Sequence, residues 1–290
     1  MSSNEIKKID AVEEKPDAVV EPADNNEAEK PWERVKNARK ENRPQAQDYI
    51  AKLFHGVFEV SGDRVYGDDP SIITAIAWFE NRPVTVIGQQ KGHTLEERMK
   101  YNFGMPRPEG YRKSMRALRQ AEKFGRPIIC FVDTPGAYHG VDAEERGQGL
   151  IIAEHLKAMA TVKAPVISII IGEGGSGGAL ALSLADRLIM LENSYFSVIS
   201  PESCASILFK DSSLAETAAE SLKLTSSDLK KFNIVDSVIK EQDGFNRFNM
   251  DKSVADIRRE IKISLRRLSR FSPDILVEKR HEKYLGMRGL

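Results

Sequence analysis

The residues most suggestive of chemistry form a glycine run, GEGGSGGA, from Gly172 to Ala179. Five of these eight residues are glycine, and the run directly follows the apolar segment APVISIII, residues 164–171. Glycine loses more backbone entropy on folding than any other residue, so such a run indicates that something must approach this backbone closely. Three kinds of site use a glycine-rich turn between a strand and a helix: a P-loop, a dinucleotide-binding turn and an oxyanion hole.

A P-loop requires the pattern GxxxxGK[ST], in which a lysine reaches the phosphates and a hydroxyl binds magnesium. No lysine follows the glycine run at that spacing. The segment DTPG, residues 133–136, is similar to a GTPase switch element, but without a P-loop it has no nucleotide to sense. These observations exclude a P-loop NTPase.

A dinucleotide-binding turn fits the spacing better, because the run matches GxGxxG and Glu192 lies 20 residues after its first glycine. A ribose-binding acid is expected at about that distance. However, residues 177–185 leave room for only a short helix, whereas a βαβ unit of about 30 residues needs a longer one. Gly175 and Gly178 also have no role in a pyrophosphate turn. The dinucleotide interpretation is therefore the weaker alternative.

An oxyanion hole needs two backbone N–H groups aimed at one point, and each is worth roughly 3–4 kcal/mol to a developing negative charge. Helix N-termini supply such groups, because their first N–H groups have no acceptor within the helix. The chain has two suitable turns, DTPGAY at 133–138 and the glycine run, each after an apolar strand. If these strands are parallel neighbours, both turns open at the same carboxyl edge, where ligands of α/β proteins bind. Close helix packing is the alternative explanation of the glycines that needs no ligand.

The elements that would position these turns are apolar strands alternating with helices. Strands are predicted at 72–78, 82–88, 126–133, 164–171, 187–192 and 195–200. Helices are predicted within 31–50 and at 109–125, 143–162, 178–186 and 250–270. A turn is expected at 81–83, and Phe124 is expected on the apolar face of the helix that Gly125 stops. The alternation indicates an α/β protein with strands buried on both faces, and a mainly helical region after about residue 200.

Composition limits the class of protein. The chain has 290 residues, 41% of them hydrophobic, and a formal net charge of zero, which argues against nucleic acid as a partner. Residues 1–30 hold nine acidic residues against four lysines, so we expect a disordered acidic tail at 1–31 and a folded domain at 32–290. The two cysteines, Cys130 and Cys204, form no CxxC pair, which argues against a disulfide framework or a metal site within this chain.

The chain also lacks targeting features. Its first residues, MSSNEIKKID, contain no apolar core of a secretory signal, and no apolar run reaches the ~18 residues of a membrane span. We therefore expect a cytoplasmic protein without a membrane partner.

Five longer segments carry a resemblance to a known family. They are GDRVYGDDPSIITAIAWFENRPVTVIGQQKG, NFGMPRPEGYRKSMR, FVDTPGAYHGVDAEERGQG, IGEGGSGGALAL and YFSVISPESCASILFK. In this order they resemble the alpha subunits of bacterial acetyl-coenzyme A carboxylase carboxyltransferase, over about residues 32–285. The resemblance implies a crotonase-like (ClpP/crotonase) fold, a spiral of ββα units around two roughly perpendicular sheets, with a helical C-terminal region.

The function that this resemblance implies is a carboxyl transfer, the first committed step of fatty acid biosynthesis. Alpha and beta subunits would form an α2β2 enzyme that moves the carboxyl group of carboxybiotin to acetyl-CoA and gives malonyl-CoA. The biotin is carried by a biotin carboxyl carrier protein and is carboxylated by biotin carboxylase. The beta subunit would contribute a four-cysteine zinc ribbon, which this chain lacks, so the chain is expected to be active only with that subunit.

The resemblance also implies which residues form the site. Gly178 and Ala179 would supply the oxyanion donors, and Gly136 and Ala137 would line the opposite wall. The residues implied in cofactor binding are Gly174, Gly175, Ser176, Gly177, Lys91 and Gly92. For Lys91 and Gly92, contact with coenzyme A phosphates and a solvated turn are both open.

Two other functional classes remain as alternatives. A crotonase-fold hydratase or hydrolase would need a catalytic acid or base, and no triad is evident because Ser176 has no histidine partner in the sequence. His155 is expected to be an interface or core residue. A non-catalytic binding module would not need two intact glycine turns. The late arginines, Arg258, Arg259, Arg266 and Arg267, are expected on a solvated helix face or a subunit interface rather than in a nucleic-acid patch.

Overall fold

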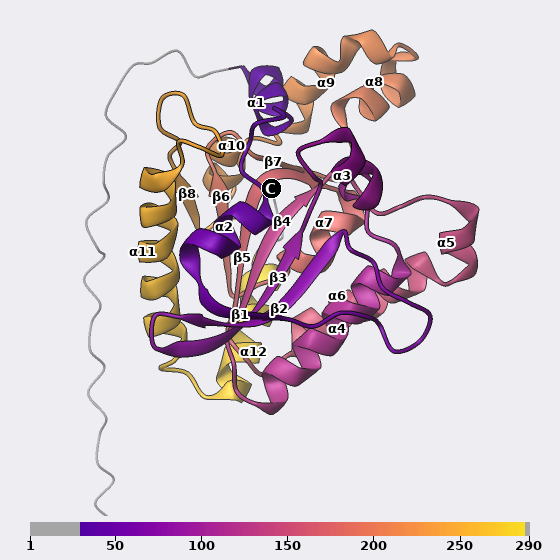
Figure 1. Ribbon diagram of the computed structural model, residues 1–290. Helices are drawn as coiled ribbons and strands as arrows, with labels where there is room; N and C mark the ends of the chain where they lie inside the picture. The colour runs from indigo at the N-terminus through magenta and orange to yellow at the C-terminus, as the bar shows by residue number, and fades with distance from the viewer. Residues whose placement is uncertain (1–29, 288–290) are drawn as a thin grey trace, which may run out of the picture.

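One mixed sheet of eight strands runs through the protein in the order β1-β2-β3-β4-β5-β6-β8, with β7 paired to the end of β5 (Figure 1). The computed structural model describes residues 30–287. The strands are β1 (His55–Glu59), β2 (Ile72–Phe79), β3 (Arg82–Gln89), β4 (Ile128–Thr134), β5 (Val166–Gly175), β6 (Arg187–Leu191), β7 (Tyr195–Ser197) and β8 (Ser237–Ile239). β1, β2 and β3 pair antiparallel, and all later pairs are parallel.

Helices connect the parallel strands and form most of the C-terminal region. They are α1 (Pro31–Ala38), α2 (Ala46–Leu53), α3 (Leu95–Lys100), α4 (Pro108–Lys123), α5 (Val141–Glu145), α6 (Gln148–Thr161), α7 (Ser176–Ser183), α8 (Pro201–Phe209), α9 (Ala215–Leu222), α10 (Ser226–Lys231), α11 (Asp251–Leu268) and α12 (Pro273–Leu285). Two 3₁₀ turns, η1 (Asn102–Gly104) and η2 (Ser212–Leu214), complete them. Within residues 30–287 no helix combines the length and the apolar character needed to cross a membrane.

The acidic tail expected at 1–31 lies outside the described residues except for its last two positions. Lys30 is the N-cap of α1, and Pro31 is its first residue. Proline suits this place, because its missing N–H would have no acceptor there. Val35 of α1 is fully buried and packs in a small cluster with residues of α9 and β7. The folded part therefore includes Lys30 and Pro31.

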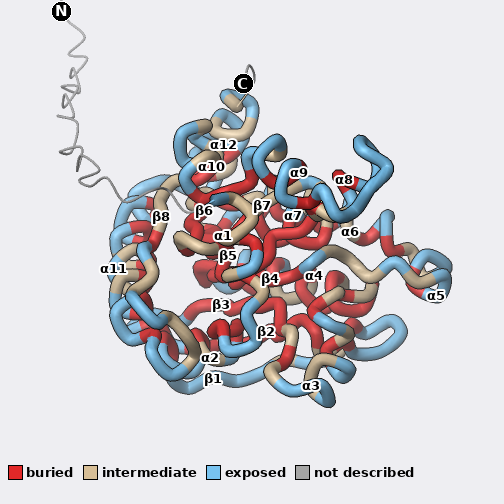
Figure 2. The backbone as a smooth tube through the Cα atoms, turned by 90° about the horizontal axis from the view of Figure 1, so that it is seen from above, coloured by how far each residue is buried: buried red, intermediate tan, exposed pale blue. Residues whose placement is uncertain are grey.

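Helices cover both faces of the central strands, as the sequence predicts. Every residue of β4 and β5 is buried, and Figure 2 shows this buried backbone at the centre of the molecule. Alternate residues face opposite layers: Ile129 and Phe131 pack with α2 and α11, whereas Cys130 and Val132 pack with α4, α6 and α7. A strand buried on both faces needs a continuous apolar run, which is what these two segments have.

Several predicted boundaries differ from the structure for local reasons. The helix predicted at 143–162 is broken into α5 and α6 at Gly147, whose φ of +83° is left-handed and interrupts a helix. The tight turn between β2 and β3 is formed by Glu80 and Asn81, so the predicted turn at 81–83 is displaced. Phe124 caps α4 and is exposed rather than part of its apolar face.

Two C-terminal elements were not predicted, β8 and α12. α12 is attached to the domain through Arg280, whose side chain is fully buried. The guanidinium donates to both carboxylate oxygens of Asp186 at 2.8 Å, and to the carbonyls of Met159, Val162 and Ala164. A buried arginine with this many acceptors explains how a weakly amphipathic helix can be fixed to the core.

Replacement of Arg280 by methionine should lower the free energy of unfolding by roughly 3–5 kcal/mol, because it leaves Asp186 as a buried carboxylate without its partner. Urea denaturation of the full chain measures this difference. The control is Lys279→Met on the exposed face of the same helix, which should change stability by less than about 0.5 kcal/mol. Equal losses in the two variants would show that Arg280 does not anchor α12.

Candidate functional site

The two turns singled out in the sequence lie next to each other at the carboxyl edge of the sheet. β4 and β5 are parallel neighbours, paired from Ile128 with Val166 to Thr134 with Gly174. The turn that begins with Pro135 follows β4, and α7 follows β5 directly. The condition set in the sequence analysis, that the two strands are parallel neighbours, is therefore met. β5 itself extends to Gly175, so the first four residues of the glycine run belong to the strand.

Most glycines of the run are required because other parts of the chain come very close. A Cβ on Gly175 would overlap the carbonyl of Pro135, and one on Gly178 would lie 2.5 Å from the backbone nitrogen of Ala137. Both contacts are with the turn after β4. A Cβ on Gly174 would lie 2.7 Å from the carbonyl oxygen of Tyr195. The packing explanation, left open by the sequence, therefore holds for these glycines. Side chains at Gly175 and Gly178 would separate the two turns, and one at Gly174 would push β7 away from β5.

The open side of this junction is formed by three other residues. Gly136 has no atom within 4 Å of the position that a Cβ would take, and Gly177 has only a methyl of Ile152 at 3.7 Å. Ser176 is exposed, whereas Gly178 and Ala179 are buried. Space for a ligand close to the backbone thus lies over Gly136, Ser176 and Gly177.

The backbone N–H groups at this place are not equivalent. α7 begins at Ser176, so helical geometry leaves the N–H groups of Ser176, Gly177 and Gly178 without an acceptor inside the helix, and no side chain caps them. Ala179 is the first residue whose N–H bonds within the helix. In the other turn, the N–H of Gly136 donates to the hydroxyl of Thr134 at 3.1 Å. The N–H groups without an acceptor inside the helix thus lie in the first turn of α7, whereas the N–H of Gly136 already has an acceptor.

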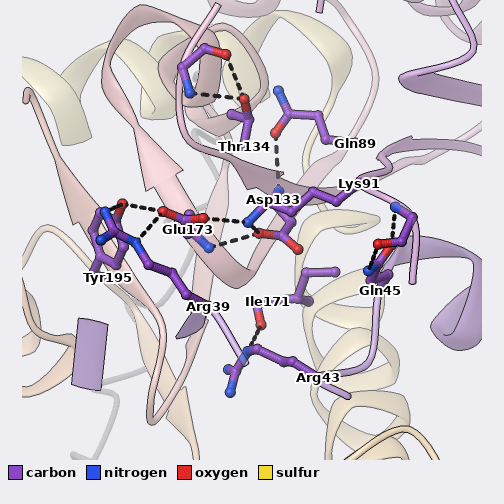
Figure 3. A network of polar contacts seen from close by, with 12 residues as sticks. Arg39, Arg43, Gln45, Gln89, Lys91, Asp133, Thr134, Ile171, Glu173 and Tyr195 are labelled. Atoms are coloured by element: carbon purple, nitrogen blue, oxygen red, sulfur yellow. Dashed lines mark hydrogen bonds and ion pairs between the residues drawn. The ribbon is translucent and has the colours of Figure 1, made fainter. Parts of the chain in front are cut away.

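A network of buried charges lies beside the two turns (Figure 3). The Lys91 ammonium contacts Asp133 Oδ1 at 2.6 Å and Glu173 Oε1 at 2.8 Å. Asp133 Oδ1 also accepts the backbone N–H of Glu173 at 2.8 Å, which ties the ends of β4 and β5 together. The other oxygen of Glu173 accepts from Arg39 at 2.8 Å and from the Tyr195 hydroxyl at 2.6 Å.

The electrostatics of this network keep Lys91 and Glu173 charged, whereas burial raises the pKa of Asp133 above its usual value. Burial would raise the pKa of Glu173, but Lys91 and Arg39 outweigh it and hold this pKa at about 2. Burial would likewise lower the pKa of Lys91, and the two carboxylates outweigh it and hold the pKa above its usual value. The ammonium and the Glu173 carboxylate therefore stay ionised at neutral pH.

Lys91 and Gly92 do not form a solvated turn. The Lys91 ammonium is held by two carboxylates, so contact with a phosphate would require it to leave them. Gly92 exchanges two hydrogen bonds with the side chain of Gln45, at 2.6 and 2.9 Å. Both residues line a pocket together with Arg39, Arg43 and other charged side chains, next to the network. Their contact with coenzyme A stays a prediction.

The sequence analysis missed the residues of this network other than Lys91. One signal for them was present: Asp133 ends a strand of apolar residues, and Glu173 interrupts the glycine run at the end of the next strand. Ionisable residues at the ends of buried strands need partners, because an unpaired buried charge is very costly. Arg39 and Tyr195 come from elements distant in the sequence, and no local pattern identifies them.

His155 is a core residue, as expected. Its side chain is fully buried, and its Nε2 lies 2.8 Å from the hydroxyl of Ser114. Burial lowers the pKa of His155 to about 4, so the ring is neutral at physiological pH. Among residues 30–287, no group of three or more His, Cys, Asp or Glu side chains is placed to hold a metal ion.

Comparison with known proteins shows close relatives over most of the chain. Residues 2–288 match the family described as acetyl co-enzyme A carboxylase carboxyltransferase-like. The acetyl-coenzyme A carboxylase carboxyl transferase subunit alpha of Halalkalibacterium halodurans is 52% identical over 255 residues, which cover 88% of this chain and 78% of the relative. The protein of the same name from Bacillus subtilis is 53% identical over 255 residues, with the same coverage of 88% and 78%.

Solved structures with lower identity share the fold. Transcarboxylase 12S, with methylmalonyl-coenzyme A and methylmalonic acid bound, has a TM-score of 0.64 at 21% identity, covering 79% of this chain and 42% of that chain. A Pseudomonas malonate decarboxylase hetero-tetramer in complex with coenzyme A has a TM-score of 0.57 at 18% identity, covering 77% and 97%. The chain thus spans less than half the length of the transcarboxylase chain. These likenesses confirm the crotonase-like fold. The strands form one mixed sheet rather than the two sheets expected, with β7 paired to the end of β5 beyond the pairing of β5 with β6.

The different surroundings of Gly175 and Gly177 give a direct test of the packing of the two turns. Gly175→Ala should lower the free energy of unfolding by about 2 kcal/mol or more, because the new methyl would overlap the Pro135 carbonyl. Gly177→Ala should leave it unchanged or raise it by up to about 1 kcal/mol, since its methyl would make an ordinary contact with Ile152 inside a helix. Thermal and urea denaturation of both variants measure the difference, and similar stabilities would contradict the close approach of the turns.

Proposed function

The chain belongs to the acetyl co-enzyme A carboxylase carboxyltransferase family, and from this premise we propose how its site works. The chain is the alpha subunit of a carboxyltransferase that moves the carboxyl group of carboxybiotin to acetyl-CoA and forms malonyl-CoA. The observation that carries this proposal is the junction of the two backbone turns. At this junction the first N–H groups of α7 have no acceptor within the helix, and Gly136 has open space beside it.

The oxyanion donors of this site are the N–H groups of Gly177 and Gly178. This assignment retains Gly178 and replaces Ala179, whose N–H bonds within the helix. Gly136 and Ala137 form the facing wall, as the resemblance implies. The positive end of the α7 dipole adds to the field of these donors, because the ligand would lie at the N-terminus of the helix.

The donors act at the moment when the carboxyl group leaves its carrier. Carboxybiotin, as the substrate, supplies the carboxyl group and, after losing it, a base for the methyl proton of acetyl-CoA. When its N–C bond breaks, the electron pair moves toward the ureido oxygen, and the N–H groups of Gly177 and Gly178 stabilise the resulting charge. The methyl carbon, once deprotonated, forms the new C–C bond to the carbon of CO2. Backbone donors suit this step, because they stabilise the charge without giving up a proton.

The proposal includes a second subunit, which supplies the other half of the site, the coenzyme A side and a zinc ribbon, in an α2β2 assembly in the cytoplasm. It also includes a biotin carboxyl carrier protein and biotin carboxylase as the source of carboxybiotin. Apolar side chains exposed on and near α8 support a protein partner on this side of the molecule. Figure 1 shows α8 at the upper right, beside α9. They are Val198, Ile207, Leu208, Phe209 and Leu214. Clustered exposed apolar residues are typical of protein interfaces.

Reconstitution with the partner tests the function. The purified chain alone should form no malonyl-CoA from acetyl-CoA and carboxylated carrier protein, because it supplies only one half of the site. Addition of the zinc-containing subunit should produce a rate at least about a hundredfold above that of either subunit alone. Robust malonyl-CoA formation by this chain alone, or none by the complex, would overturn the proposal.

One observation favours a second candidate, a hydrolase. Residues 174–178 match the pattern GxSxG, and Ser176 lies exposed at a strand-to-helix turn with a φ of +51°. A nucleophile elbow has this geometry. However, the hydroxyl would need a base, and within residues 30–287 no hydrogen bond joins Ser176 to a histidine, while His155 bonds to Ser114. The carboxyltransferase explains the site without such a base.

Replacement of Ser176 by glycine separates the two functions. The change removes the hydroxyl but keeps the backbone N–H, and glycine accepts the left-handed φ of this position without strain. For a carboxyltransferase, the rate of malonyl-CoA formation by the assembled complex should stay within about threefold of the wild type. A serine hydrolase would instead lose activity by about a thousandfold or more. The same preparations are assayed for ester hydrolysis and for carboxyl transfer.

A further inference from the structure

The side chain of Gln89 joins the end of β4, just before its turn, to the first turn of α7. Gln89 is the last residue of β3 and is fully buried. The parallel pairing of β3 with β4 ends at Gly88 with Phe131. Beyond it, Gln89 Oε1 accepts the backbone N–H of Asp133 at 3.1 Å (Figure 3), and Nε2 donates to the carbonyl of Gly178 at 2.9 Å. The side chain thus continues the pairing of the sheet and reaches the first turn of α7.

An amide is suited to this place because it offers an acceptor and a donor at a fixed separation in one plane. Asp133 is the next-to-last residue of β4, two residues before the turn that begins with Pro135, and Gly178 carries one of the proposed donors. The hydroxyl of the fully buried Tyr111 is the other side-chain donor to the same carbonyl, at the longer distance of 3.5 Å. Loss of the Gln89 amide would leave the buried N–H of Asp133 without its acceptor, and the carbonyl of Gly178 without the side-chain donor that ties it to β3.

We infer that Gln89 is a positioning residue for carboxyl transfer, which fixes the first turn of α7 against the turn after β4. This inference rests on the proposed function and deepens it. The carbonyl of Gly178 belongs to the peptide plane that follows the donor, so its bond to Gln89 limits the rotation of the helix turn that carries the N–H groups. Oxyanion donors act through fixed direction and distance, and a displacement of about 1 Å can cost about a hundredfold in rate.

The next residue provides a matched control. Gln90 is also buried, and its amide likewise makes two hydrogen bonds: Oε1 accepts the N–H of Gln47 at 3.1 Å, and Nε2 donates to Gln45 at 2.7 Å. These partners lie at the start of α2, and neither belongs to the two turns. Loss of the Gln90 amide therefore has a comparable effect on buried hydrogen bonding without touching the donors.

The first experiment compares Gln89→Met with Gln90→Met in the assembled complex. Methionine has nearly the same length as glutamine and makes no comparable hydrogen bond. Gln89→Met should lower kcat for malonyl-CoA formation by about ten- to a hundredfold and leave KM for acetyl-CoA within about twofold. Gln90→Met should leave both constants within about twofold. Equal kinetic constants for the Gln89 variant and the wild type would overturn the inference, as would equal losses of kcat in both variants.

Amide hydrogen exchange of the full chain without its partner gives a readout that does not need activity. In Gln89→Met, residues 133–138 and 174–180 should exchange at least about tenfold faster than in the wild type, and in Gln90→Met they should not. Unchanged exchange in the Gln89 variant would overturn the inference. If Gln89→Met does not fold, Gln89→Asn replaces it, because this amide is one methylene shorter and cannot reach both turns. A wild-type complex that forms no malonyl-CoA would refute the proposed function, and exchange would still decide whether Gln89 fixes the turns.

Discussion

The backbone of the turn after β4 packs directly against the backbone of the glycine run, and the whole site depends on this contact. It excludes side chains at Gly175 and Gly178, because a Cβ at either position would meet the other turn. It also brings the N-terminus of α7 beside Gly136, at an edge where two parallel strands end. The glycines therefore shape the proposed site indirectly. They let two pieces of backbone meet, and the residues on the open side, Gly136 and Gly177, keep space beside their backbone.

The buried ion network beside the turns supports the same arrangement. Asp133 holds the backbone N–H of Glu173, and Lys91 lies between the two carboxylates, so the ends of β4 and β5 are cross-linked by charge as well as by the sheet. Lys91 neutralises much of the negative charge that would otherwise repel the oxyanion in the proposed reaction. Because its ammonium is held by two carboxylates, it is also not free to protonate a substrate. A site that stabilises charge through neutral N–H groups benefits from both properties.

The sequence predicted those parts of the fold and site that depend on local patterns. The apolar runs predicted β4 and β5 and their common edge, and the glycine run predicted a close approach. Which glycines pack against the other turn and which lie on the open side was not predictable from the sequence. This depends on tertiary contacts such as the one between Gly175 and Pro135. Helix α12 was missed because it has little amphipathic pattern, and its anchor Arg280 looks like an ordinary surface residue in the sequence. The partners of Lys91 were missed because they follow it by about 40 and 80 residues.

A site built from backbone N–H groups responds to mutation in a particular way. No substitution of a side chain deletes the N–H of Gly177 or Gly178, except a change to proline, which would also alter the helix. What substitution can change is the position of these groups. Their position depends on contacts below the surface of the site, including the amide of Gln89 and the packing of Gly175 on Pro135. The residues that matter most for the rate in this chain are therefore expected among buried residues that never touch the substrate, because they determine where its backbone donors lie.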